Sequence, residues 1–440
     1  MKHTFFLALT LALTISCKSS HTPVADQFVT VRDGRFFIGE QPYNYVGANF
    51  WYGAILGSEG QGGNRERLCR ELDDLCQLGV RNLRILVGGE GTSDRPDHIR
   101  PMLQPQPGEY NDTLLQGLDY LMAELGRRDM RAVLYLHNAW QWSGGYGTYL
   151  EWAGEGEAAP ANVWNEYTRY HSRFVTNQKA RELALRHTRF IVSRTNSVTG
   201  RAYRDDPALM AWEICNEPRP FARDTKTKGG YFGWIQEQAK AIKEIDPNHL
   251  VTTGSEGKFG SEMDIDLYER VHALKEIDYL CIHIWPYTWT WLGPFISPNS
   301  EAKVRQPADM LEKGIEPACQ ETKRYIDEHA QVAQRLGKPL VLEEFGYPRD
   351  GFEIAIGTPT TARDRYYAFV FSHVGPTKPI AGCNFWAWGG RANVRHPFWQ
   401  EWDDYTGDPA QEEQGLYSVF QSDKSTIDVI RQAGEFMIGN

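Results

Sequence analysis

Eight short apolar runs alternate with longer amphipathic segments along most of this 440-residue chain. The apolar runs have the length and composition of buried parallel strands, and they cover residues 43–48, 83–87, 132–136, 209–214, 250–253, 279–282, 340–342 and 380–385. The clearest amphipathic segments are 65–78, 113–127, 178–194, 232–245, 315–335 and 361–373, each long enough for a crossover helix. Because no GxGxxG follows the first run, the pattern predicts a closed (β/α)₈ TIM barrel more than an open doubly wound sheet.

The organisation of the chain predicts a single large domain over residues 26–440, since no long Ser, Pro or Gly tract divides it. Four of the loops that follow strands are long and rich in Trp, Tyr, Gly and Asp: 139–160, 218–230, 284–307 and 387–414. In such barrels the loops after the strands share the C-terminal face, where catalytic sites are found. We therefore expect an extended cleft at that face.

The N-terminal segment has the form of an export signal, with a basic start and an apolar stretch too short to span a bilayer. Thr14-Ile15-Ser16-Cys17 resembles a bacterial lipobox, which predicts a signal peptide over 1–16, a lipidated Cys17 and a linker over 17–25. The alternative is an ordinary secretory signal cut nearby. We expect an exported lipoprotein anchored to the membrane through Cys17, at the periplasmic face of the envelope or the cell surface.

Charge and cysteine patterns exclude several classes of partner. The formal net charge is −10, and Lys and Arg are scattered among acidic residues, so we expect no nucleic-acid partner. The six cysteines after Cys17 form no CxxC pair and no Cys/His cluster, so we predict neither a metal site nor a cofactor. We expect a monomer. The 14 Trp and 21 Tyr residues suit stacking on sugar rings, although an aromatic core would also use them.

Two apolar runs on opposite sides of the predicted barrel end in carboxylates. Glu217 follows the fourth run in Asn216-Glu217-Pro218, and Glu344 follows the seventh in Glu343-Glu344-Phe345. An acid and a carboxylate facing each other at roughly 5 to 5.5 Å are what retaining glycosidic cleavage requires. Each could instead be a structural strand-end residue. Glu343 is the rival to Glu344, but strand alternation predicts that neighbouring side chains point to opposite sides of the sheet.

Over about residues 43–420 the sequence resembles glycoside hydrolase family 5 of clan A. The motifs that carry the resemblance are Arg84 in Asn82-Leu83-Arg84-Ile85, His137, Asn216-Glu217-Pro218, His283, Glu344-Phe345-Gly346 and Trp386. The resemblance implies that Glu217 is the acid/base and Glu344 the nucleophile. It also implies that Asn216 donates to the sugar 2-hydroxyl and that Arg84 keeps Glu344 ionised.

The remaining positions of the resemblance imply contacts with substrate. His137 and His283 would bind sugar hydroxyls or orient the carboxylates, and Trp386 would be the stacking platform, with Trp388 as the alternative. The family usually has His-x-Tyr where this chain has His283-Ile284-Trp285, so the role of Trp285 is open between hydrogen bonding and stacking.

Longer stretches are similar to bacterial β-mannanases of the family, including residues 47–53 with Trp51, 137–145, 283–286 and 407–417. This implies an endo-β-1,4-mannanase acting on mannan, galactomannan or glucomannan by double displacement, with Trp51 among the substrate contacts. The alternatives are an endo-β-1,4-glucanase of the same family, a lipoprotein that captures polysaccharide without turnover, and an enzyme that favours transglycosylation.

Overall fold

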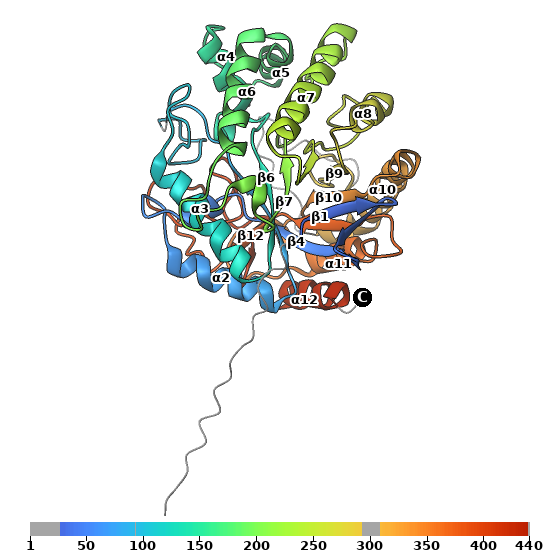
Figure 1. Ribbon diagram of the computed structural model, residues 1–440. Helices are drawn as coiled ribbons and strands as arrows, with labels where there is room; N and C mark the ends of the chain where they lie inside the picture. Colours follow the sequence, from blue (N-terminus) through green and yellow to red (C-terminus); the bar gives the residue numbers. More distant parts are fainter. Residues whose placement is uncertain (1–26, 93, 293–308, 439–440) are drawn as a thin grey trace, which may run out of the picture.

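Eight parallel strands form the central sheet of the computed structural model, which describes residues 27–92, 94–292 and 309–438 (Figure 1). Their order in the sheet is β8-β7-β6-β5-β4-β11-β10-β9. Their bounds are β4 Tyr45–Asn49, β5 Asn82–Leu86, β6 Arg131–Tyr135, β7 Leu209–Glu213, β8 Leu250–Thr252, β9 Leu280–Ile284, β10 Leu340–Phe345 and β11 Gly382–Phe385. Every residue of these strands is buried, because helices cover the outer face of the barrel and packed side chains fill its interior. The eight predicted strands and the barrel architecture are confirmed.

The two edge strands of this sheet, β8 and β9, meet at a seam that nearly closes the barrel. Backbone and side-chain atoms of Asp278 bridge the seam, because Asp278 N donates to Val251 O at 2.8 Å and Asp278 Oδ2 accepts from Val251 N at 2.7 Å. The Thr252 hydroxyl donates to Tyr279 O at 3.1 Å. Side-chain bonds thus replace part of the missing backbone ladder.

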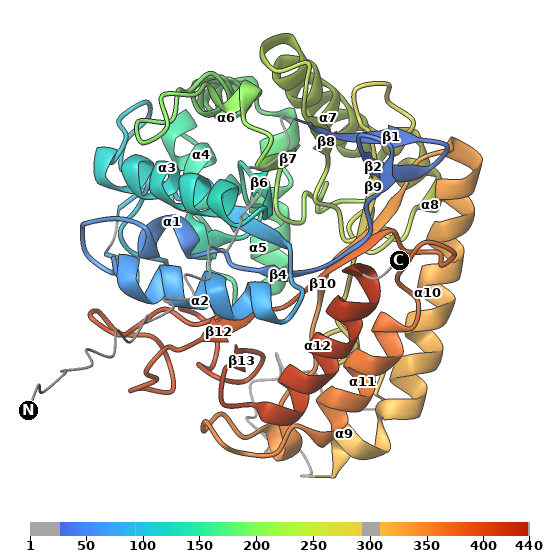
Figure 2. The same ribbon diagram turned by 60° about the horizontal axis from the view of Figure 1, so that its bottom comes forward.

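Helices cover the outside of the barrel between successive strands. The longer ones are α2 Arg65–Gln77, α3 Asp112–Arg127, α6 Gln178–Val192, α7 Thr225–Ile245, α8 Ile265–His272, α10 Ile315–Leu336, α11 Thr361–Phe371 and α12 Lys424–Ile438. Five of them begin after an Asn or Asp whose side chain accepts a backbone N–H of the first turn: Asn64, Asn111, Asn177, Asp224 and Asp264. The six predicted helices are all present, and α10, α11 and α12 lie side by side (Figure 2).

A small antiparallel sheet, which the sequence pattern did not predict, covers the amino-terminal end of the barrel. It consists of β1 Val29–Arg32, β2 Arg35–Ile38 and β3 Gln41–Pro42. Phe36 packs edge-on against Tyr279, with ring centroids 5.3 Å apart, and Phe28 packs against His249 at 4.9 Å. Figure 2 shows β1 and β2 beside β8 and β9. The sheet therefore covers the barrel floor next to the seam.

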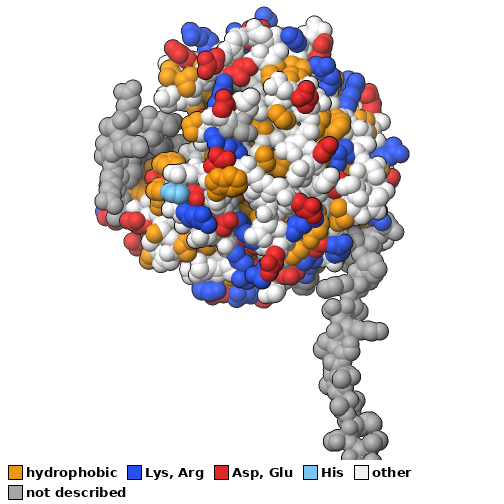
Figure 3. Space-filling model, turned by 90° about the vertical axis from the view of Figure 1, so that its left-hand side faces the viewer, with side chains coloured by type: hydrophobic (Ala, Val, Ile, Leu, Met, Phe, Trp, Pro, Cys, Tyr) orange, Lys and Arg blue, Asp and Glu red, His pale blue; other side chains and the backbone are white. Residues whose placement is uncertain are grey.

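Further short elements build the loops at the C-terminal face and the outer wall. They are α1 Gly53–Leu56, η1 Gln141–Ser143, α4 Gly145–Ala153, α5 Trp164–His171, η2 Phe174–Thr176, η3 Tyr203–Asp205, α9 Met310–Lys313, η4 Asp350–Phe352, β12 Trp388–Gly390 and β13 Val419–Phe420. Basic and acidic side chains are interspersed over the face shown in Figure 3. None of the helices in the described ranges combines the length and apolar composition needed to cross a bilayer. The predicted signal peptide, Cys17 and the linker to residue 25 lie outside the described residues.

Candidate active site

Glu217 and Glu344 face each other across one cleft of about 730 Å³ at the carboxyl ends of the strands. Glu217 follows β7, with its backbone in the left-handed region at φ 50°, and its N–H donates to Gly254 O at 2.9 Å. His283 Nδ1 lies 2.9 Å from Glu217 Oε1 and 3.2 Å from Glu344 Oε2, and one oxygen of each acid and one ring nitrogen lie within 4.8 Å of one another. The structure therefore brings the two acids together, as the sequence predicts.

Arg84 lies fully buried beneath the cleft and binds four polar groups at once, one of which is Asn49, whose Oδ1 accepts from Nη1 at 3.0 Å. Its Nη1 donates to Glu344 Oε1 at 2.5 Å, its Nε and Nη2 donate to Glu213 at 2.7 and 2.6 Å, and Nη2 also donates to Asn216 Oδ1 at 2.9 Å. Burial alone would lower the pKa of Arg84, but the charges of Glu213 and Glu344 raise it well above its usual value. Arg84 is thus a fixed cation that holds Glu344 from below rather than a contact for substrate.

Asn216 connects this cation to the loop after β6. Its Oδ1 accepts from Arg84, and its Nδ2 donates to Asn138 Oδ1 at 3.0 Å. Asn138 Oδ1 also accepts from the backbone N–H of Trp140 at 3.1 Å, and the Trp140 indole donates to Glu217 Oε2. Asn216 lines the cleft as predicted. The bond from Trp140 to Glu217 was not predicted, although both residues stand in motifs that the sequence singles out.

His283 bridges the two acids from a position that is fully buried. Burial alone would lower the pKa of its imidazole, but the charge of Glu344, the hydrogen bond with Glu217 and the other nearby carboxylates together raise the pKa well above the usual value. The surrounding carboxylates therefore favour the protonated form of the ring. Its position orients the carboxylates, which is one of the two roles implied by the resemblance.

Glu343 and Glu344 both point toward the barrel interior, which corrects the prediction that they lie on opposite sides of the sheet. The register of β10 against β9 shifts between Leu342 and Glu344, as in a β-bulge. A bulge places two successive side chains where a regular strand would place one. Glu344 reaches the cleft, whereas Glu343 stays below it with the Tyr279 hydroxyl 3.3 Å from its Oε1. Glu344 remains the residue at the cleft.

Aromatic side chains form much of the cleft wall. Trp285 and Trp386 line it as predicted, packed edge-on with ring centroids 5.9 Å apart, and Tyr417 packs against Trp285 at 5.3 Å. Further aromatic residues that line it are Trp140, Trp142, Trp164, Phe259 and Trp289. Such flat apolar faces suit the stacking of sugar rings. Trp285 thus contributes packing at the position where the family usually has Tyr.

Three charged residues of the cleft were missed by the sequence analysis. Arg219 pairs with Glu256, with Nη2 donating to Oε1 at 2.8 Å, and both line the cleft. Glu412, from the loop after β12, is half-buried in the cleft wall, and its desolvation together with the charges of Asp408, Glu344 and Glu217 raises its pKa well above the usual value. Arg219 directly follows Asn216-Glu217-Pro218 and Glu412 lies within the stretch 407–417, whereas Glu256 has no sequence signal.

Three predicted substrate contacts are packed away from the cleft, and these assignments are corrected. His137 Nε2 lies 2.8 Å from Thr188 Oγ1, and burial lowers the pKa of His137 well below the usual value, so the ring is a neutral core group. Trp51 is buried and donates to Gly407 O at 2.8 Å. Trp388 is buried on β12 and donates to Glu71 Oε2 at 3.1 Å. Of the two alternatives for the stacking platform, Trp386 lines the cleft and Trp388 does not.

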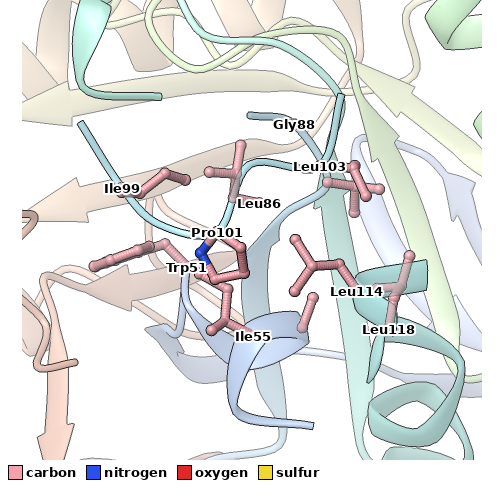
Figure 4. Close-up of a pocket in the computed structure, with 11 residues that line it drawn as sticks. Trp51, Ile55, Leu86, Gly88, Ile99, Pro101, Leu103, Leu114 and Leu118 are labelled. Carbon is pink, nitrogen blue, oxygen red and sulfur yellow. The ribbon is translucent and has the colours of Figure 1, made fainter. Parts of the chain in front are cut away.

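A second cavity beside Trp51 is too small to hold a sugar. It is lined by Trp51, Ile55, Leu86, Ile99, Pro101, Leu103, Leu114 and Leu118, among others (Figure 4). Its volume is about 20 Å³, close to the space of one water molecule, and its walls are apolar. We assign it to core packing.

Two groups of buried carboxylates and imidazoles have polar atoms close enough to hold a cation. They are Glu90 with His137 and His187, and Glu217 with His283 and Glu344. In the first group Tyr149 and Gly145 donate to Glu90, and His137 and His187 have their own partners. In the second group Arg84 and Trp140 donate to the carboxylates. These donors already neutralise or occupy the acidic oxygens, so we assign no metal to either group.

Comparison with known proteins identifies the family. A family described as glycoside hydrolase family 5 β-mannosidase-like matches residues 26–438. The chain is 27% identical to putative mannan endo-1,4-beta-mannosidase 9 of Oryza sativa subsp. japonica, over 96% of this chain and 93% of that protein. It is 30% identical to mannan endo-1,4-beta-mannosidase 3 of Solanum lycopersicum, over 76% of each.

A solved structure is similar over nearly the whole length of both chains. The E202A mutant of a glycoside hydrolase family 5 mannosidase from Rhizomucor miehei, in complex with mannosyl-fructose, superposes with a TM-score of 0.83 at 32% identity. The match covers 94% of this chain and 98% of that one. The chain therefore belongs to glycoside hydrolase family 5, among its β-mannosidase-like members, and is a glycoside hydrolase.

Proposed function

We propose that the protein hydrolyses β-1,4-linked mannan-type polysaccharides with retention of configuration, by a mannanase-type double displacement. The observation that carries the proposal is the asymmetric pair of acids in one aromatic cleft. Glu344 contacts the permanent cation Arg84, whereas Glu217 receives hydrogen bonds from His283 and Trp140. We assign Glu344, which the guanidinium orients from beneath the cleft, as the nucleophile, and Glu217, which faces it, as the acid/base, the roles that the family resemblance implies.

In the proposed first step, a Glu344 oxygen bonds to the anomeric carbon while the bond to the leaving sugar oxygen breaks. Glu217 gives its proton to that oxygen, so the glycosyl-enzyme and a Glu217 carboxylate result. In the second step Glu217 takes a proton from water, the water oxygen bonds to the anomeric carbon, and the bond to Glu344 breaks. Two inversions give net retention, which fits carboxylate oxygens that approach within 4.8 Å.

Mannan as the substrate is supported by the names of the relatives and by the mannosyl-fructose complex of the Rhizomucor miehei enzyme. Mannose and glucose differ only at the 2-hydroxyl, so the contacts near Asn216 would make the discrimination. The alternative of an endo-β-1,4-glucanase has no comparable support among these relatives.

A second candidate function is exo-acting hydrolysis, in which short manno-oligosaccharides are cleaved at the chain end and not at internal linkages. Glu412 favours it, because a half-buried carboxyl in the same cleft as Glu217 and Glu344 could bind the hydroxyls of a chain end. The similar solved structure from Rhizomucor miehei holds mannosyl-fructose, which is a short ligand.

The experiment is to incubate the purified protein with galactomannan, glucomannan, carboxymethyl cellulose and mannotriose, and to identify the products. A rapid fall in galactomannan viscosity with mixed short products supports internal cleavage, and mannose as the sole early product supports the second candidate. Products longer than the starting mannotriose would reveal transglycosylation. Activity on carboxymethyl cellulose alone would overturn the assignment to mannan.

A further inference from the structure

Glu343 is a buried carboxylate below the cleft that the proposed mechanism does not use. The bulge in β10 turns it inward beside Glu344, where its Oε1 accepts from the Tyr279 hydroxyl at 3.3 Å. Its other oxygen, Oε2, is buried without a hydrogen-bond partner among the described residues. Buried polar atoms are nearly always satisfied in native proteins, so such an oxygen requires an explanation.

The group that faces this oxygen is the imidazole of His283. Its Nε2 lies 3.9 Å from Glu343 Oε2 and is likewise buried without a hydrogen bond within the part of the chain that the structure describes. On the opposite side of the ring, Nδ1 lies 2.9 Å from Glu217 Oε1 and 3.2 Å from Glu344 Oε2. His283 is therefore surrounded by three carboxylates, one below it and two above.

This arrangement decides how many protons the ring carries. Nδ1 faces two acidic oxygens and must donate to be satisfied. In a neutral imidazole Nε2 would then be a bare lone pair directed at the Glu343 carboxylate, which is repulsive. A second proton on Nε2 turns that contact into an attraction between opposite charges.

The other charged groups around His283 are also mostly acidic. Glu213 lies on β7 and Glu256 follows β8, and the charge of each interacts with that of His283. Two cations nearby are already paired, Arg84 on β5 with Glu213 and Glu344, and Arg219 with Glu256. Glu343 is thus the carboxylate whose free oxygen is available to the lower side of the ring.

We propose that Glu343 is a positioning residue that keeps His283 doubly protonated, so that the Nδ1–H stays directed at both Glu217 and Glu344 throughout the reaction. The proposal rests on the proposed function for the roles of those two acids. When Glu344 becomes an ester and Glu217 a carboxylate, the negative charge passes from one neighbour of Nδ1 to the other. A fixed imidazolium can follow that charge by changing its hydrogen bond, without moving its own proton.

The direct test is nitrogen NMR of protein labelled with ¹⁵N-histidine, in which the His283 signals are assigned by their loss in His283→Gln. We expect both ring nitrogens of His283 in the full-length protein to keep imidazolium shifts from pH 5 to 8.5. In Glu343→Gln the ring should lose a proton within this range. Tyr279→Phe is the matched control, because it removes a bond to Glu343 but leaves the charge, and its His283 should stay an imidazolium.

The same variants give a second measurement through the pH dependence of kcat/KM on mannotriose. Glu343→Gln should stay near the wild-type value at pH 5.5 and fall by about tenfold for each pH unit above the new pKa of His283. A His283 that is neutral in the wild-type protein at pH 7 overturns the proposal, whether or not Glu343→Gln folds. So does a Glu343→Gln variant with unchanged nitrogen shifts and an unchanged profile. Because the NMR measurement needs no turnover, a failure of the proposed function leaves this test intact.

Discussion

The indole N–H of Trp140 donates a hydrogen bond to Oε2 of Glu217, which joins the loop after β6 to the carboxyl group after β7. Trp140 thereby fixes the orientation of Glu217 from the side opposite to His283, which lies 2.9 Å from Oε1. One carboxylate oxygen of Glu217 is therefore bound by the indole nitrogen of Trp140, and the other by the imidazole of His283. This bond is directly testable.

Replacing Trp140 by Phe should keep a ring in the cleft wall but remove the N–H. A hydrogen bond to an ionisable group contributes about 1.5–3 kcal/mol, so kcat/KM on mannan should fall by about 10- to 100-fold. Steady-state kinetics with a thermal melt would check this. Trp152→Phe is the control, since Trp152 packs on Tyr149 outside the cleft. Equal losses in the two variants would count against a role for the indole N–H.

Replacing either acid should abolish hydrolysis without unfolding the protein. Glu217→Ala and Glu344→Ala should each lose on the order of 10³-fold or more in kcat. Added azide separates the two roles. In Glu344→Ala azide should attack the sugar directly and give an inverted product, whereas in Glu217→Ala it should attack the glycosyl-enzyme and give a retained one. Proton NMR of the glycosyl azide reads the configuration, and the opposite pattern would exchange the roles.

Arg84→Met should be costly for both stability and activity, because it leaves the buried Glu213 and Glu344 without their cation. Breaking a buried pair in this way lowers the free energy of unfolding by about 3–5 kcal/mol. Arg349→Met is the matched control, since Arg349 is equally buried and pairs with Asp423 at 2.5 Å outside the cleft. Denaturant unfolding should show similar losses, but only Arg84→Met should lose most of its kcat. Comparable activity in both variants would contradict the role of Arg84.

Glu90 predicts a pH dependence of stability. Burial raises the pKa of Glu90 from 4.5 to about 7, despite hydrogen bonds from Gly145 N–H and Tyr149. The folded state therefore binds this proton more tightly than the unfolded state. The resulting stabilisation is full below the unfolded pKa and is lost as the pH rises through about 7, by about 3 kcal/mol in total.

Glu90→Gln should remove this dependence, because the amide cannot ionise. The unfolding free energy measured in urea should fall between pH 5 and pH 8 by about 2.5 kcal/mol more in the wild type than in the variant. An equal fall in both proteins would mean that Glu90 does not titrate in this interval.

The sequence also predicts a lipid anchor, which we propose as the means of localisation. Expressed in a bacterial host, the full chain should sediment with membranes, and Cys17→Ala should release it or leave it unprocessed. Detergent extraction followed by mass spectrometry of the mature N-terminus would identify the lipid. A soluble wild-type protein, cut at another residue, would support the ordinary secretory signal instead.

Local sequence patterns were sufficient to predict the barrel and the positions of the two acids, Glu217 and Glu344. Strands buried on both faces read as apolar runs, and Glu217 and Glu344 stand where such runs end. The bulge that brings Glu343 inward has no local signature, because it depends on the pairing of β10 with β9. His137 also ends a strand, but its ring turns toward Thr188 and the helices, so strand position alone could not give its role.

Loop residues were the other part that the sequence could not place. Glu412 reaches the cleft only because the long segment after β12 folds back over the barrel mouth. Trp51 stands in a motif shared with mannanases, yet its indole turns away to Gly407. In both cases the decisive contact joins residues that are far apart along the chain.

The small N-terminal sheet determines how the domain would be held if it is tethered. The described chain enters at the barrel floor, where Phe28 and Phe36 pack beside His249 and Tyr279, while the cleft opens at the other end of the strands. An attachment point upstream of Gln27 would thus join the described chain at the end of the barrel opposite to the cleft. A long polymer could then bind along the cleft without contact with the surface to which the enzyme is attached.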